Sequence, residues 1–103
     1  MDKWNPNQYS KFSSERAKPF WDLADLVRNP FHKIVLDIGC GTGELTAALH
    51  EKWGSSATLG IDSSDKMLEK TKSITEKNLT FLKSDVRSFC PTPKYEIIFS
   101  NAA

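Results

Sequence analysis

The stretch from residue 34 to residue 53 restricts the fold more than any other part of the chain. A short apolar run, Ile34–Ile38, is followed by three glycines at alternate positions, Gly39, Gly41 and Gly43, and then by residues with helical spacing. The β-branched run predicts a buried strand. Glycines at this spacing let the backbone turn sharply and bring its N–H groups close to a ligand. A strand, a glycine loop and a helix in this order predict an α/β fold with a parallel sheet.

The alternation of strand and helix continues along the chain. We expect further strands at 57–62, 79–82 and 95–100, and a helix over about 65–75. With the first strand they form a parallel sheet of order 3-2-1-4, flanked by helices. We therefore expect a partial Rossmann-like sheet without the C-terminal strands of a complete one. The outer edge of the fourth strand is then open to self-association.

Asp62 stands at the end of the second predicted strand, 23 residues after Gly39. A carboxylate at this place can accept hydrogen bonds from both ribose hydroxyls of an adenosine. The alternative is that Asp62 is only a cap or turn residue, a role that Ser63 and Ser64 can already fill. The order and spacing of strand, glycine loop and acidic residue favour the ribose.

Glu44 bears on whether the nucleotide carries phosphates. A dinucleotide fingerprint needs a third glycine five residues after Gly39, and that position holds Glu44. Its carboxylate would repel a pyrophosphate at the start of the helix. S-adenosylmethionine (SAM), an adenosine with a sulfonium and an amino-acid tail but no phosphate, fits this loop better than NAD. A P-loop is excluded because no Gly-Lys-Ser/Thr follows.

Other candidate residues lie near this loop or apart from it. Asp85 ends the third strand, where it can meet the adenine edge or cap a short turn. Asp37 can bond loop N–H groups or lie near the ligand's ammonium group. Cys40 is expected to be a small side chain in a tight loop rather than a nucleophile. His32 and His50 show no metal-ligand spacing and are predicted at the surface or its boundary, so no metal site is expected.

The composition excludes several classes of partner. The 103 residues carry 14 basic and 13 acidic side chains, a formal net charge of +1, so no basic surplus attracts nucleic acid or membrane phosphates. Two cysteines are too few for a disulfide scaffold, and no apolar run has signal-peptide or bilayer-spanning length. We therefore expect a cytoplasmic protein with no nucleic-acid or membrane partner.

The motifs together resemble those of class I SAM-dependent methyltransferases. The matching stretches are Asp37–Gly43, Gly60–Ser64, Met67-Leu68, Ser84–Val86 and Ile97–Asn101. The opening Trp4–Tyr9, followed by Phe12 and Ser14–Pro19, resembles the start of the trans-aconitate 2-methyltransferase family. The resemblance covers nearly the whole chain, but only the N-terminal portion of that family's length.

The resemblance also implies roles for individual residues. It places Ser100 and Asn101 near the transferred methyl group, and Tyr9 and Arg16 over the cofactor's carboxylate end or the substrate. The residues implied to line the methionine, ribose and adenine parts of SAM are Gly39, Cys40, Gly41, Asp62, Ser63, Met67, Asp85 and Val86. A hydrophobic flap over the core is the alternative for the aromatic residues of the N-terminal stretch, Trp4, Tyr9 and Phe12.

We expect residues 1–30 to form an N-terminal helical flap or cap, and residues 31–103 to form a truncated SAM-binding Rossmann-like domain. A helix from Pro19 is expected to end at Asn29-Pro30. The implied function is methyl transfer from SAM to a carboxylate of a small organic acid such as trans-aconitate, which needs no general base because a carboxylate is ionised at neutral pH. A non-catalytic fragment that binds SAM or S-adenosylhomocysteine (SAH) is the alternative, and a NAD-binding oxidoreductase fragment is less favoured.

Overall fold

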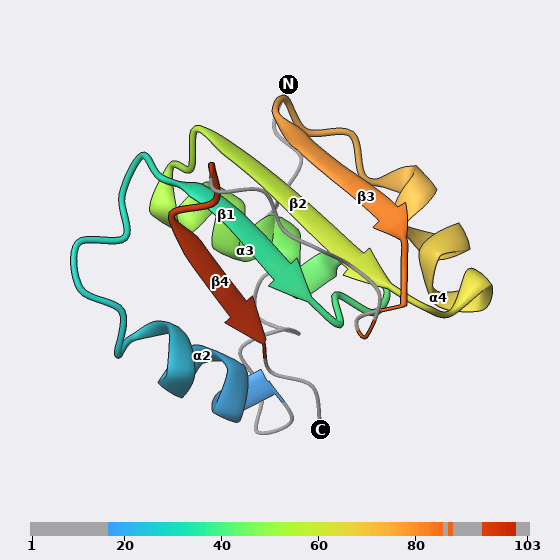
Figure 1. Cartoon of the computed structure of the whole chain (residues 1–103), viewed down its shortest axis with the longest axis horizontal. Coiled ribbons are helices and arrows are strands. Elements are labelled where there is room, and N and C mark those ends of the chain that lie inside the picture. Colours follow the sequence, from blue (N-terminus) through green and yellow to red (C-terminus); the bar gives the residue numbers. More distant parts are fainter. Residues whose placement is uncertain (1–16, 86, 88–93, 101–103) are drawn as a thin grey trace.

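The computed structural model describes residues 17–85, 87 and 94–100. Its four described strands form one parallel sheet in the order β3-β2-β1-β4, which confirms the predicted order (Figure 1). Central β1 carries three buried residues in sequence, as expected for a strand covered on both faces. The strands are β1 (Ile34–Ile38), β2 (Ala57–Asp62), β3 (Leu79–Lys83) and β4 (Ile97–Ser100).

Helix α3 (Glu44–Trp53) lies behind the sheet in the view of Figure 1 and connects β1 to β2. Left-handed glycines bound this helix at both ends, with Gly43 at φ 89° and Gly54 at φ 54°. Glycine adopts this conformation without the steric cost that a Cβ adds. The predicted start and end of this helix are therefore confirmed.

The first described helix, α2 (Lys18–Ala24), is shorter than predicted. The prediction that Asn29-Pro30 ends it is wrong. Beyond Ala24 the chain forms turns, in which backbone hydrogen bonds join residues three apart. Most helices in proteins are stabilised by packing of an apolar face. Leu26, the second residue after the helix, has 77% of its area exposed, so it adds no such packing to a longer helix. The backbone then reverses at Asn29, which has a φ of 51°.

The helix predicted over about 65–75 also ends early. Helix α4 covers Asp65–Lys70, and a 3₁₀ turn, η2, covers Thr71–Ser73. The Thr71 hydroxyl donates a hydrogen bond to the Leu68 carbonyl at 2.6 Å. A side-chain hydroxyl that takes a backbone acceptor in this way competes with the regular helical pattern.

The core joins α2 to the sheet and to α3. The ring of Phe20 meets that of Phe99 edge-on at 5.0 Å, and Trp53 meets Phe99 in the same manner at 6.1 Å. Val35 and Leu49 complete this buried cluster and are fully shielded from solvent. The division between residues 1–30 and 31–103 stays a prediction, although α2 shares this core with the second segment.

The parallel register brings the C-terminal ends of all four strands to one edge. Ile38 pairs with Ile61 on one side and with Ser100 on the other, and Asp62 pairs with Lys83. In open α/β sheets, ligands bind outside this edge, at the point where the strand order reverses. Here that point lies at the end of β1, where the glycine loop begins.

Among the described strands, β4 pairs only with β1, and Ile98 on β4 is 53% exposed. Self-association through this edge stays a prediction. The fourth strand begins at Ile97 rather than at residue 95, since the Glu96 carboxylate accepts the N–H of Ile34 at 2.9 Å. None of the helices in the described part of the chain is both long and apolar enough to cross a bilayer.

We predict that Phe20→Ala lowers the free energy of unfolding by roughly 3–5 kcal/mol, because it removes a ring packed in the core. Urea unfolding followed by circular dichroism measures the change. Phe31→Ala is the matched control, since Phe31 is 52% exposed and should cost less than about 0.5 kcal/mol. Equal losses in the two variants would contradict the placement of α2 in the core.

Candidate cofactor site

The glycine loop is tied to the end of the neighbouring strand β2. The N–H groups of Gly39 and Cys40 both donate to the Ile61 carbonyl, at 2.8 and 2.9 Å. The N–H of Gly41 donates to the Asp62 carboxylate at 3.0 Å. Three consecutive N–H groups are thus fixed by two consecutive residues of β2, which sets the shape of the loop before any ligand arrives.

The second and third glycines of the loop serve different purposes. A Cβ on Gly43 would lie 2.9 Å from the Phe81 ring and 3.0 Å from the Thr71 methyl group, so this glycine permits packing between α3 and its neighbours. A Cβ on Gly41 would meet nothing within 4 Å, and only its φ of 61° favours glycine. The space over Gly41 is therefore open to a ligand.

Asp62 links the loop to the start of α4. One of its oxygens accepts the Gly41 N–H, and the other accepts the Ser64 N–H at 2.9 Å. Ser64 in turn caps α4 by accepting the Met67 N–H at 3.3 Å. The turn role that the sequence left as an alternative is thus present. Each carboxylate oxygen can accept a second hydrogen bond, so contact with a ribose stays a prediction that this geometry permits.

A hollow of about 190 Å³ lies beside the loop at the ends of β1, β2 and β3. It brings together four of the predicted site residues, Gly39, Asp62, Ser63 and Asp85. This volume is below the roughly 300–1,000 Å³ usual for ligand pockets, so it suits one part of a larger ligand. The remaining lining residues are Ile38, Ile61 and Ser84.

Asp85 is held by a near neighbour in the chain. Its carboxylate accepts the Arg87 N–H at 2.9 Å and pairs with the Arg87 guanidinium at 3.1 Å. These hydrogen bonds hold the pKa of Asp85 below its usual value. The capping alternative from the sequence is therefore present, while contact with adenine stays a prediction.

The other predicted site residues lie apart from this hollow or outside the described chain. Met67 is on the first turn of α4 and is 44% exposed, and Ser100 ends β4 beside Ile38. Their roles stay predictions. The residues Trp4, Tyr9, Arg16, Val86 and Asn101 lie outside the described residues.

Asp37 is buried and is not among the residues that line the hollow. It is 2% exposed, and its carboxylate accepts a hydrogen bond from the Thr46 hydroxyl of α3 at 2.5 Å. Burial raises the pKa of Asp37 to about 6, and the bond from Thr46 opposes this shift. The sequence did not predict a role for Thr46. Its hydrogen bond to Asp37 joins β1 to α3, the two elements that flank the glycine loop.

Cys40 fits its predicted role as a small buried side chain. Its thiol pKa is raised to about 12 by burial and by the negative charges of Asp37 and Asp62. A thiol with such a pKa is protonated at neutral pH and is a poor nucleophile.

Within the described ranges, no group of three or more His, Cys, Asp or Glu side chains converges on a point where a metal could bind.

The prediction that His50 lies at the surface or its boundary is wrong, because the residue is buried, with 8% of its area exposed. Its Nε2 lies 3.0 Å from the Lys77 carbonyl and its Nδ1 lies 2.7 Å from the Thr58 hydroxyl. A carbonyl only accepts, so Nε2 carries a hydrogen; in the neutral ring, the Thr58 hydroxyl then donates to Nδ1. His50 therefore joins α3, β2 and the segment before β3. His32 is exposed, as predicted.

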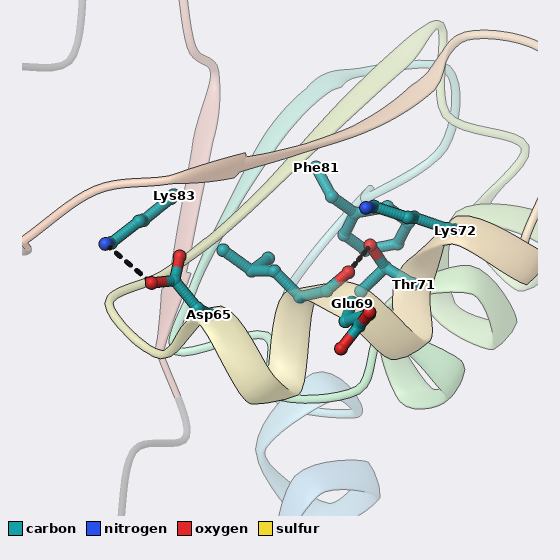
Figure 2. Close-up of a pocket in the computed structure, with 7 residues that line it drawn as sticks. Asp65, Glu69, Thr71, Lys72, Phe81 and Lys83 are labelled. Carbon is teal, nitrogen blue, oxygen red and sulfur yellow. Dashed lines mark hydrogen bonds and ion pairs between the residues drawn. The ribbon is translucent and has the colours of Figure 1, made fainter.

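A larger hollow, of about 460 Å³, lies between α4, η2 and β3 (Figure 2). Its walls include no residue of the glycine loop and not Asp62. Two of its lining residues, Lys83 and Asp65, form an ion pair at 3.0 Å, which is drawn as a dashed line in Figure 2. The smaller hollow is the better candidate for the cofactor, because its lining includes Gly39 of the loop and Asp62.

Comparison with known proteins identifies the family. Residues 35–103 match the family described as methyltransferase domain. The chain therefore belongs to the methyltransferase domain family, and the resemblance found in its motifs is confirmed at this level.

Two curated relatives carry the same name. The chain is 37% identical over 103 residues to trans-aconitate 2-methyltransferase of Escherichia coli O1:K1 / APEC, covering all of this chain and 40% of that protein. It is 38% identical over 105 residues to trans-aconitate 2-methyltransferase of Shigella flexneri, with the same coverage. The chain thus spans about 40% of the length of these relatives.

Solved structures agree with the fold. An S-adenosylmethionine-dependent methyltransferase from Mesorhizobium loti superposes with a TM-score of 0.69 at 25% identity, over 79% of this chain and 37% of that one. The plantazolicin methyltransferase BpumL, solved in complex with SAH, has a TM-score of 0.63 at 22% identity, over 93% and 42% of the two chains. The second likeness concerns the fold alone.

We predict that Asp37→Asn raises the free energy of unfolding at pH 7 by roughly 3 kcal/mol, because it removes a buried charge. The pKa of Asp37 rises from 3.8 when unfolded to about 6 when folded, so the folded state binds its proton more tightly. The stability that Asp37 contributes is present below about pH 4 and is lost as the pH rises to about 6.

Urea unfolding at several pH values between about 4 and 7 measures this effect as the difference between wild type and variant. Asp65→Asn, which alters an exposed carboxylate, is the control and should show no such trend. A difference that stays constant over this pH range would show that Asp37 does not titrate as a buried group.

Proposed function

We propose that this chain is the N-terminal cofactor-binding portion of a SAM-dependent methyltransferase that methylates a carboxylate of a small organic acid such as trans-aconitate. The observation that carries the proposal is the bond from the Gly41 N–H to Asp62 in a chain of the methyltransferase domain family. It presets a glycine loop beside a carboxylate that can accept ribose hydroxyls. Relatives and structural neighbours named for SAM or trans-aconitate support the cofactor and substrate classes.

We expect the loop and the hollow to contact different parts of SAM. Under this proposal, Gly39, Cys40 and Gly41 contact the methionine part, Asp62 and Ser63 the ribose, and Asp85 the adenine edge. The register of β1 with β4 supports a place for Ser100 near the reacting methyl group, because Ser100 lies beside Ile38. The remaining proposed contacts come from Met67, Val86 and Asn101, with Trp4, Tyr9 and Arg16 near the substrate.

Methyl transfer from SAM to a carboxylate requires the protein to align the reactants rather than to transfer a proton. SAM supplies, when bound, a methyl group on a sulfonium that is already an activated leaving group. The chain's residues hold the cofactor in place and limit water, so that the substrate can approach in line with the methyl–sulfur bond. A carboxylate substrate is ionised at neutral pH and needs no base. The product is a methyl ester.

Two alternatives remain distinguishable by experiment. A SAM- or SAH-binding fragment without catalysis would bind the cofactor and produce no ester. The methyltransferase domain match counts against a NAD-binding oxidoreductase fragment. Isothermal titration with SAM, SAH and NAD separates the NAD alternative from the other two, and mass spectrometry of trans-aconitate incubated with SAM and the chain separates enzyme from binding fragment. Absence of SAM binding would overturn the proposal.

We predict that Asp62→Ala weakens SAM binding by roughly 1–3 kcal/mol, because the ribose hydroxyls and the Gly41 N–H lose their acceptor. Isothermal titration measures the affinity, and a thermal melt checks that the fold persists. Asp65→Ala is the matched control, since this exposed carboxylate is three residues away and pairs with Lys83. Unchanged affinity in Asp62→Ala would remove Asp62 from the site.

A further inference from the structure

The ring of Phe81 lies against two glycines, one from each of the two chain segments that form the cofactor site. Phe81 is a partly buried residue of β3 and packs against the core cluster that includes Leu79. A Cβ on Gly43 would lie 2.9 Å from the ring, and a Cβ on Gly60 would lie at the same distance. Carbon atoms in contact are normally about 3.5–4.0 Å apart, so the ring occupies space that a side chain at either position would need.

Gly60 is a glycine because of this close packing. Gly43 has a φ of 89°, a conformation that favours glycine whatever surrounds it. Gly60, in β2 two residues before Asp62, has no positive φ. Its backbone conformation suits any residue, so the lack of space next to the Phe81 ring is what excludes a side chain there.

The ring reaches the glycine loop near both of its ends. A Cβ on Gly60 would also lie 2.9 Å from the Cβ of Cys40, so Cys40 and Phe81 cover Gly60 from the same side of β2. Gly43, at the end of the loop, is in contact with the ring and with the methyl group of Thr71, which would lie 3.0 Å from an added Cβ. The hydrogen bonds to β2 hold the loop from one side, and Phe81 supports it from the other.

We infer that Phe81 is a positioning residue of the cofactor site, which holds the glycine loop in the shape that binds the amino-acid tail of SAM. This inference rests on the proposed function and adds a residue to it that does not itself touch the cofactor. Thr71 assists, because its methyl group packs over Gly43 beside the ring.

The larger hollow explains why a smaller side chain at position 81 would leave the loop without this support. Phe81 and Thr71 are both among the residues that line that hollow of about 460 Å³ (Figure 2). A gap made by trimming the ring would therefore be continuous with the hollow, and the surroundings close such gaps only in part. The loop would sample more conformations before a ligand binds, and ordering it on binding lowers the affinity.

The proposed contacts indicate which part of the ligand depends on Phe81. Under the proposed function the loop residues Gly39, Cys40 and Gly41 bind the methionine part of SAM, and Asp62 binds the ribose. A loosened loop should therefore weaken ligands that have the amino-acid tail more than ligands that lack it. SAH and 5′-methylthioadenosine form such a pair, because both have the adenosine and a neutral thioether and only SAH has the tail.

The test measures the affinities of SAH and 5′-methylthioadenosine by isothermal titration for wild type and Phe81→Leu. We expect the ratio of the SAH to the 5′-methylthioadenosine affinity to fall roughly three- to tenfold in Phe81→Leu. Thr71→Ser covers the case in which Phe81→Leu does not fold. It removes the methyl group over Gly43 and keeps the hydroxyl that donates to the Leu68 carbonyl, and the ratio should fall about twofold.

Leu79→Val is the matched control for a general loss of packing. Leu79 is buried in the core cluster against which Phe81 packs, but it is not among the nearest neighbours of a Cβ at Gly43 or Gly60. This variant should lower the stability and leave the affinity ratio unchanged. An unchanged ratio in Phe81→Leu, or an equal fall in Leu79→Val, would overturn the inference.

Hydrogen exchange without any ligand tests the inference separately from the proposed function. The N–H groups of Gly39, Cys40 and Gly41 are hydrogen-bonded to β2, so their exchange rates report how often the loop opens. Mass spectrometry should show these rates rising several-fold in Phe81→Leu and not in Leu79→Val. Unchanged rates would overturn the positioning role, whereas failure of the wild type to bind SAM would overturn the proposed function and leave this measurement valid.

Discussion

The hydrogen bonds of the Asp62 carboxylate join the glycine loop to the start of α4. Gly41 follows β1 and Ser64 precedes α4, and both donate their N–H groups to this side chain. The parallel pairing of Ile38 with Ile61 makes this possible, because it brings the end of β1 level with the end of β2. Hydrogen bonds from two backbone N–H groups to one carboxylate fix the loop and the helix relative to each other, which pairing between strands alone cannot do.

The sheet could be predicted from the sequence because its signals are local. The strands at 34–38 and 57–62 have the predicted bounds, since each is a short apolar run that ends in glycine or aspartate. The helix ends were less predictable. Thr71 ends α4 by taking a carbonyl with its hydroxyl, and the turn after Ala24 replaces regular helical bonds. Both events depend on competing hydrogen bonds that apolar periodicity does not record.

The cofactor site was predictable where it depends on topology and not where it depends on packing. Gly39 and Asp62 meet because parallel strands end at one edge. Thr46 and His50 were missed, although their spacing held a signal: with Leu49 and Trp53, they fall three, four and seven residues apart and so share one helical face. A polar residue on a buried face needs a partner, and the sequence did not identify Asp37 and Thr58 as those partners.

Asp37 and Thr46 illustrate why buried polar residues beside the loop cannot be replaced by apolar residues one at a time. An apolar residue at position 37 would remove a buried charge, but it would leave the Thr46 hydroxyl buried without its acceptor. A change at Thr46 would leave the carboxylate without its one described donor, at a higher cost. An apolar replacement therefore has to change both residues together, whereas asparagine at position 37 removes the charge and keeps an acceptor for the Thr46 hydroxyl.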